Sequence, residues 1–99
     1  MTTLEERSKQ KKKEEQMEII LNHYVDGEVY ISTPSKVWKQ IVLNHFNKVY
    51  RNELTVDELL TLLQREGVQF NQSLKLVRYP VVECLRFISA CCNKDIDIS

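Results

Sequence analysis

The sequence predicts a mostly α-helical protein, a small compact bundle of four to five helices with at most a minor two-stranded β element. Three observations predict this fold class. Apolar residues recur at helical spacing in several stretches, and two of the helices would begin at a capping box. The stretch from residue 80 to residue 93 is apolar over most of a helix circumference, which is typical of a buried helix.

The chain of 99 residues is long enough for one domain with a modest core. We expect a solvated helical arm over residues 1–16, a single helical domain over residues 17–93 and a loose polar tail over residues 94–99. The arm is expected to be solvated because the segment from Glu5 to Gln16 includes no apolar residue.

The first helix is predicted to begin at the capping box Thr3-Leu4-Glu5-Glu6 and to end at Asp26-Gly27, where glycine tolerates the positive φ of a helix stop. Only the second half of this helix offers an apolar face for docking. That face consists of Met17, Ile20, Leu21, Tyr24 and Val25.

Residues 28–32 follow as a short extended piece, and residues 68–70 are its predicted partner in the minor β element. Thr33 and Pro34 suit the N-cap and the first position of a second helix, which runs to about Tyr50. The inward face of that helix is predicted to consist of Val37, Trp38, Ile41, Val42, His45, Phe46 and Val49.

The third helix is predicted to begin at the capping box Thr55-Val56-Asp57-Glu58 and to end in a Schellman motif with Gly67 in the left-handed conformation. After it, residues 74–78 fit either a short helix or a strand, and we favour the helix. The last helix, from Pro80 at its first position to Asn93, is expected to form the centre of the core. Burial of each large apolar side chain contributes about 1.5–3 kcal/mol.

The composition excludes several classes of protein. The chain has 14 basic and 14 acidic residues, so no whole-molecule field attracts nucleic acid or an anionic membrane. No apolar run reaches the roughly 20 residues of a membrane span, and the N-terminus has no apolar signal core, so we expect a cytoplasmic protein. The chain has 3 cysteines, and because this number is odd we expect no disulfide framework. We expect all of them to be reduced and buried.

Catalysis is the weakest functional hypothesis, and we predict that the protein is not an enzyme. His23 and His45 lie beside apolar helix faces, which favours a core or boundary position over a general base. A zinc site built from a histidine with Cys84, Cys91 and Cys92 would take most of its ligands from one helix, unlike the usual knuckle spacing. We therefore expect no metal, no cofactor and no small-molecule substrate.

The leading hypothesis is a small regulatory protein that binds other proteins, as a dimeric adaptor or as an inhibitor of a larger partner. Hydrophobic residues make up 42% of the chain, and Ile19, Leu43 and Leu62 lie off the predicted inward faces. A helical domain of this size is not expected to bury all of them, and an exposed apolar patch usually marks an interface. We therefore predict a homodimer whose interface includes Leu43 or Leu62.

The alternative hypothesis is a helix-turn-helix-like DNA-binding regulator, because residues 55–79 have the outline of a helix, a glycine turn and a second helix. Near the start of that second helix, the side chains able to contact bases, phosphates or an acidic partner are Asn71, Gln72, Ser73, Lys75 and Arg78. The predicted outer face of the helix over residues 34–50 adds Lys36, Lys39 and Lys48, with Arg51 just beyond. The long turn and the zero net charge are atypical of such DNA-binding proteins.

Overall fold

The computed structural model describes residues 14–94 and residue 96. The predicted capping box at residues 3–6 lies outside the described residues, as does most of the predicted arm. Of the predicted tail, the structure describes only Lys94 and Ile96.

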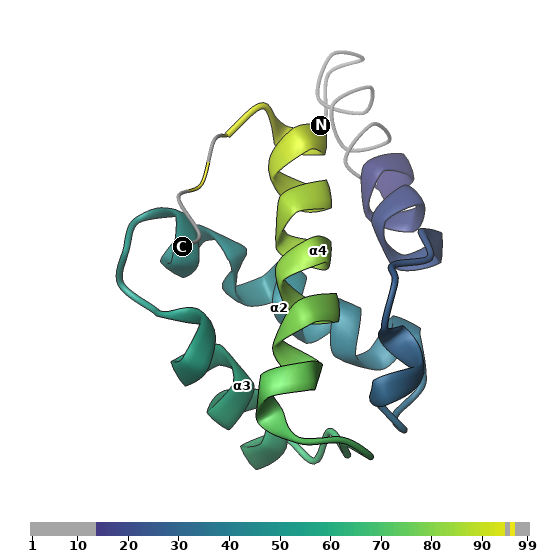
Figure 1. Ribbon diagram of the computed structural model, residues 1–99. Helices are drawn as coiled ribbons and strands as arrows, with labels where there is room; N and C mark the ends of the chain where they lie inside the picture. Colours follow the sequence, from purple (N-terminus) through teal and green to yellow (C-terminus); the bar gives the residue numbers. More distant parts are fainter. Residues whose placement is uncertain (1–13, 95, 97–99) are drawn as a thin grey trace.

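Residues 14–22 are helical. They are followed by the 3-10 helix η1 (Glu28–Tyr30) and by the α-helices α2 (Ser35–Tyr50), α3 (Val56–Arg65) and α4 (Leu74–Cys92). Figure 1 shows α4 in the middle of the molecule, with helix 14–22 on one side, α3 on the other and α2 crossing behind. The predicted fold class, a small helical bundle, is confirmed, and within the described residues the structure has no strand.

The core is built around α4, as predicted. Its side chains Val77, Val81, Leu85 and Ile88 recur at helical spacing and are fully buried. They belong to one buried cluster with residues of the two neighbouring helices, namely Trp38, Val42 and Phe46 of α2 and Leu59, Leu60 and Leu63 of α3. The lateral packing of α2 and α3 therefore depends on the inward face of α4.

Pro80 lies inside α4 and not at its first position, so this prediction is wrong. The short helix favoured for residues 74–78 is confirmed, but it continues through Pro80 into the long apolar helix. An internal proline removes one backbone hydrogen bond and costs about 3 kcal/mol or more. The continuous helix offsets part of this cost by keeping Val77 on the same buried face as Val81 and Leu85.

The first helix ends at residue 22, earlier than the predicted stop at Asp26-Gly27. Beyond residue 22, side chains bind the backbone groups that would otherwise continue the helix. The carbonyl of His23 accepts a hydrogen bond from Lys39, and the N–H of Val25 donates one to Glu28. As a result Ile20 and Val25 are buried, whereas Tyr24 is exposed.

Gly27 has the predicted positive φ, 87°, and it is the N-cap residue of η1. Residues 28–30 therefore form a 3-10 turn, and the extended piece predicted there is wrong. The position also requires glycine for space. A Cβ atom there would lie 3.2 Å from Cδ of Pro80 and 3.2 Å from Cδ1 of Tyr79. Glycine thus allows the segment before η1 to approach the first half of α4 closely.

The predicted pairing of residues 28–32 with residues 68–70 is reduced to one antiparallel bridge between Ile31 and Phe70. Thr33 contributes to this contact, because its hydroxyl accepts the N–H of Gln69 at 2.8 Å. That hydrogen bond takes the place of the predicted N-cap, and Pro34 is the N-cap residue of α2.

Both ends of α3 are as predicted. The Thr55 hydroxyl accepts the N–H of Glu58, and the Glu58 carboxylate accepts the N–H of Thr55, each at 3.1 Å. At the other end, Gly67 has φ 94°, and Val68 N–H donates to the carbonyl of Leu63 in the Schellman pattern.

Candidate functional site

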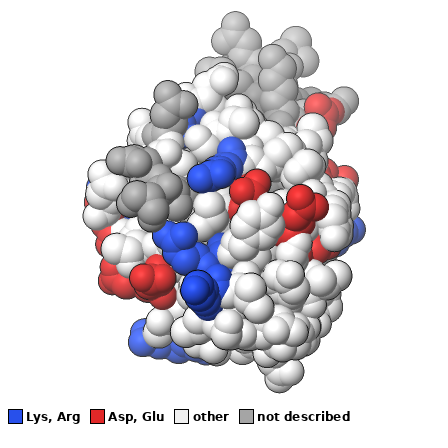
Figure 2. All heavy atoms as spheres, viewed as in Figure 1, with Lys and Arg blue, Asp and Glu red and all other residues white. Residues whose placement is uncertain are grey.

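The outer face of α4 carries a shallow groove of about 360 Å³, which we name the α4 groove. Its lining residues are Lys75, Arg78, Tyr79, Val82, Glu83 and Arg86. In Figure 2, blue Lys and Arg side chains run in a band over this face, with red acidic side chains on both sides. The groove therefore has a local positive charge that the zero net charge of the chain does not reveal.

The helical repeat explains why these side chains share one face. Lys75, Tyr79, Val82 and Arg86 follow one another at intervals of three and four residues, which places them along one side of a helix. Val77, Val81 and Leu85 use the opposite side for the core. The rigid central helix thus holds the lining of the α4 groove in place.

Two arginines of the α4 groove make exposed ion pairs. Arg78 Nε lies 3.8 Å from Oδ1 of Asp57, whose side chain is 87% exposed. Arg86 Nη1 lies 3.4 Å from Oε1 of Glu83. Exposed pairs of this kind contribute about 0–1 kcal/mol, so the carboxylates of a partner would replace them at little cost.

The predicted contact residues before α4 have different positions. Gln72 and Ser73 are exposed, next to Lys75 at the start of the α4 groove. Asn71, in contrast, holds the fold together. Its side-chain Nδ2 donates to the carbonyl of Val29 at 2.8 Å and to Oγ of Ser32 at 3.2 Å. The Asn71 amide is therefore engaged within the fold.

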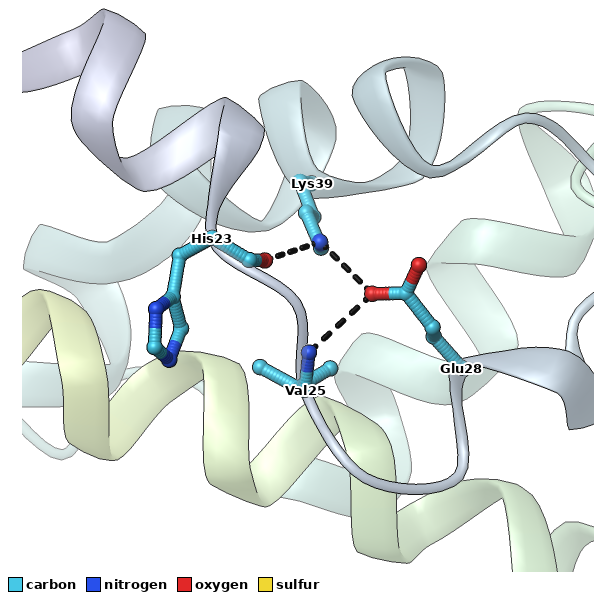
Figure 3. A network of polar contacts seen from close by, with 4 residues as sticks. All are labelled: His23, Val25, Glu28 and Lys39. Carbon is cyan, nitrogen blue, oxygen red and sulfur yellow. Dashed lines mark hydrogen bonds and ion pairs between the residues drawn. The ribbon is translucent and has the colours of Figure 1, made fainter.

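Lys39 was predicted on the basic outer face of the second helix, and this prediction is wrong, because Lys39 is 1% exposed. Figure 3 shows its ammonium group between the carbonyl of His23 and the carboxylate of Glu28. The Nζ atom lies 2.8 Å from Oε2 of Glu28, and the same oxygen accepts the N–H of Val25 at 3.1 Å. Burial of the ammonium is tolerated because the Glu28 carboxylate pairs its charge and two of its three donors have acceptors.

The other basic residues of this predicted face, Lys36, Lys48 and Arg51, are exposed. They do not line the α4 groove. The structure therefore brings Lys75 and Arg78 together in one groove and leaves the basic residues of α2 outside it. Arg86 completes the groove and was missed, because the apolar composition of residues 80–93 indicated burial for most of that helix.

The three predicted interface residues do not share one groove. Ile19 is 58% exposed, and Leu62 is half-buried. Leu43 is half-buried against the core and lines a second groove, between helix 14–22, α2 and α4. The sequence analysis missed some apolar exposure at the α4 groove, where the lining residue Tyr79 is 49% exposed and the neighbouring Leu76 is 44% exposed. It also placed Val37 on the inward face of α2, and this prediction is wrong, because Val37 is 50% exposed.

The two histidines make structural contacts. The His23 ring stacks on the Phe87 ring with centroids 3.7 Å apart, and Nδ1 of His45 lies 2.8 Å from the carbonyl of Ile41. In the part of the chain that the structure describes, no group of three His, Cys, Asp or Glu residues is placed to hold a metal ion.

The cysteines differ in their environment, and no disulfide joins them. Cys84 is buried as predicted, and burial raises the pKa of its thiol from 9.0 to about 12. Cys91 and Cys92 are only half-buried, so the prediction that all the cysteines are buried is wrong for these two. They follow the last fully buried turn of α4, where the core ends.

Thiol labelling should separate the cysteines. In native buffer at neutral pH, Cys84 is expected to react with Ellman's reagent only on unfolding, because burial suppresses its thiolate. Cys91 should react slowly, since burial and the neighbouring Cys92 raise its thiol pKa. The measurement is the absorbance of released thiolate over time for wild type and Cys84→Ala. If the absorbance released before unfolding is smaller for Cys84→Ala than for wild type, Cys84 reacts in the native protein and is not buried.

None of the helices over residues 14–94 is long and apolar enough to cross a membrane. No protein-family model matches the sequence, and comparison with curated proteins and with solved structures finds no similar chain.

Proposed function

We propose that this chain is a non-enzymatic regulatory protein that acts by binding another protein through the α4 groove. The observation that supports this proposal is the combination of Lys75, Arg78 and Arg86 with the half-exposed ring of Tyr79 on one face of the central helix. Charge complementarity provides specificity and fast association, whereas a few hot-spot residues, often Trp, Tyr or Arg, provide most of the binding energy of an interface. The partner surface that fits this groove is an acidic segment with apolar side chains.

A protein partner fits the groove better than DNA does. Glu83 lines the groove and Asp57 lies beside Arg78, so carboxylates alternate with the cations. A protein segment can offer basic and apolar side chains as well as acidic ones to such a surface, whereas a phosphate backbone offers negative charge alone. The amide of Asn71, one of two amide side chains here that could read adenine, donates to the carbonyl of Val29 and to Oγ of Ser32.

DNA binding is the second candidate, and one observation favours it. Gln72, Ser73 and Lys75 are exposed around the first turn of α4, in the position from which a recognition helix contacts base edges. Binding of this kind should weaken steeply with salt, because each neutralised phosphate releases counterions. Fluorescence anisotropy of labelled duplex DNA at increasing salt measures that slope directly.

Charge reversal of the α4 groove should weaken partner binding. In the variant with Lys75→Glu, Arg78→Glu and Arg86→Glu, we expect the affinity for the protein partner to fall by tenfold or more, about the effect of placing like charges across an interface. The measurement is quantitative capture from extracts of the native host, compared between wild-type and variant bait, followed by titration of the purified partner.

The matched control carries the same change of charge elsewhere, as Lys36→Glu, Lys48→Glu and Arg51→Glu on and just after α2. This control should retain the partner, because its residues do not line the α4 groove. Equal capture by both triple variants would refute the groove as the docking surface. Salt-dependent DNA binding that only the α4 variant loses would favour the second candidate.

A homodimer remains part of the proposal, with Leu43 or Leu62 in its interface. Two-fold pairing is the commonest way in which a small domain covers apolar surface. Leu43→Lys or Leu62→Lys should therefore shift the protein to a monomer in sedimentation equilibrium at micromolar concentration, with Ile19→Lys as a third probe. A wild-type monomer at low and high salt would contradict this prediction and leave a heterologous partner.

A further inference from the structure

The groove that contains Leu43 has the features of a ligand site. Its volume is about 420 Å³, within the range of roughly 300–1,000 Å³ that small-molecule sites occupy. It lies between helix 14–22, α2 and α4, and we name it the inter-helix groove. The residues that line it are Gln16, Met17, Ile20, Leu43, Asn44, Phe46, Asn47, Ile88, Cys92 and Lys94.

The lining is divided by chemistry. On its apolar side, Met17 is exposed and Leu43 is half-buried, and both lie over the core residues Ile20, Phe46 and Ile88, which are buried. The polar lining comes from the amides of Gln16, Asn44 and Asn47 and from the ammonium of Lys94. The groove therefore fits a molecule with an apolar body and a polar head.

Lys94 indicates the charge of the ligand's polar head group. Its Nζ lies 3.4 Å from Oδ1 of Asn47 and 5.5 Å from the centre of the Tyr50 ring, so its contacts are with neutral groups. Among the described residues that line the inter-helix groove, none carries a carboxylate. An anionic head beside Lys94 would gain a charge-assisted hydrogen bond, and the Asn47 amide would supply a second donor.

A hydrogen bond across the edge of the groove fixes helix 14–22 relative to α4. Gln16 Nε2 donates to the carbonyl of Cys91 at 2.5 Å, which ties helix 14–22 to the last turn of α4. The groove is thus present before any ligand arrives, as is usual for small-molecule sites.

From these observations we propose that the inter-helix groove binds a small amphipathic carboxylate. Its alkyl chain lies against Met17 and Leu43, and its carboxylate lies between Lys94 and Asn47. This site is separate from the α4 groove, so it adds a small-molecule ligand to the protein-binding function proposed above. Within a series of alkyl carboxylates, affinity should rise about fourfold for each methylene that the groove buries.

The test uses Cys92 as a reporter, because it lines the inter-helix groove. In the Cys91→Ser variant, Cys92 is labelled with a maleimide in the absence and presence of decanoate, below the concentration at which decanoate forms micelles. At a decanoate concentration ten times its Kd, the labelling rate should fall about tenfold, because only the unoccupied protein reacts. No slowing at any concentration would overturn the proposal.

Leu43→Trp, in the same Cys91→Ser background, should fill the apolar side of the groove and lower the affinity by about tenfold or more. The matched control is Leu76→Trp, because Leu76 is 44% exposed and does not line this groove. Equal protection of Cys92 in both variants would also overturn the proposal. Circular dichroism establishes that each variant is folded before labelling.

Lys94→Glu tests the head group at an exposed position that core packing does not need. This variant should lower the affinity for decanoate and raise the affinity for decylamine, each by up to about fivefold. Lys48→Glu is the control for overall charge. If decylamine protects Cys92 of the protein with Lys94 intact as well as decanoate does, the carboxylate class is wrong. This comparison of decanoate with decylamine tests the proposal even if Leu43→Trp does not fold.

Discussion

Leu85→Ala is expected to lower the free energy of unfolding by about 2–5 kcal/mol, the usual cost of removing a large side chain from a packed core. Leu85 is 0% exposed and lies in the middle of α4, between the helices that flank it. The loss would be a large share of a typical domain stability of about 5–15 kcal/mol. Urea unfolding followed by circular dichroism measures it as a lower midpoint with an unchanged slope.

Leu76→Ala provides the control within the same helix. Leu76 is 44% exposed, so the same truncation should change the stability by no more than about 0.5 kcal/mol. If the two variants unfold at the same urea concentration, α4 does not have the central position that we assign to it.

Lys39→Met is the second change with a large expected effect. It removes the ammonium but keeps most of the side-chain volume, so Glu28 loses its ion-pair partner and the carbonyl of His23 loses its donor. Breaking a buried ion pair costs about 3–5 kcal/mol. We expect the lower end of this range, because the Glu28 side chain is 18% exposed and water partly solvates it. Urea unfolding again gives the measurement.

A double-mutant cycle separates the ion pair from simple packing. Glu28→Gln keeps an acceptor for the N–H of Val25 but removes the charge, so Lys39→Met should cost less in the Glu28→Gln background than in wild type. Lys36→Met is the matched control, because Lys36 is an exposed lysine of the same helix. Equal effects of Lys36→Met and Lys39→Met would show that the buried contact adds no stability.

The sequence predicts helix ends well where the signal is local. The hydroxyl of Thr55, the carboxylate of Glu58 and the missing side chain of Gly67 act within a few residues of their own position, so their pattern determines the start and end of α3. Pro80 is the opposite case. Its local preference for a first helical position is overridden by the burial of Val77, which depends on the tertiary fold.

Lys39 shows how charge misleads a prediction of burial. A lysine is almost never fully buried unless paired, so Lys39 was placed on the outer face with Lys36 and Lys48. Its spacing indicated otherwise, because Lys39 precedes the buried residues Val42 and Phe46 by three and seven positions. The partner that permits its burial, Glu28, comes from η1, and the sequence alone does not show that these segments meet.

The candidate site was predictable in part. Lys75 and Arg78 follow from their helical spacing, but Arg86 joins them only because α4 is one continuous helix. The inter-helix groove was not predictable, since Gln16, Leu43 and Cys92 come from three separate segments. Leu43 was recognised as lying off the inward face, although its groove depends on how helix 14–22 docks.

The contact between Gln16 and Cys91 also affects co-translational folding, because it joins residues separated by 75 positions. At a synthesis rate of about 5–20 residues per second, roughly 4–15 s pass between the two. During this interval helix 14–22 has no C-terminal half of α4 to pack against, and Ile20 and Val25 have yet to reach the core. A nascent chain therefore leaves these early apolar side chains exposed until α4 is made.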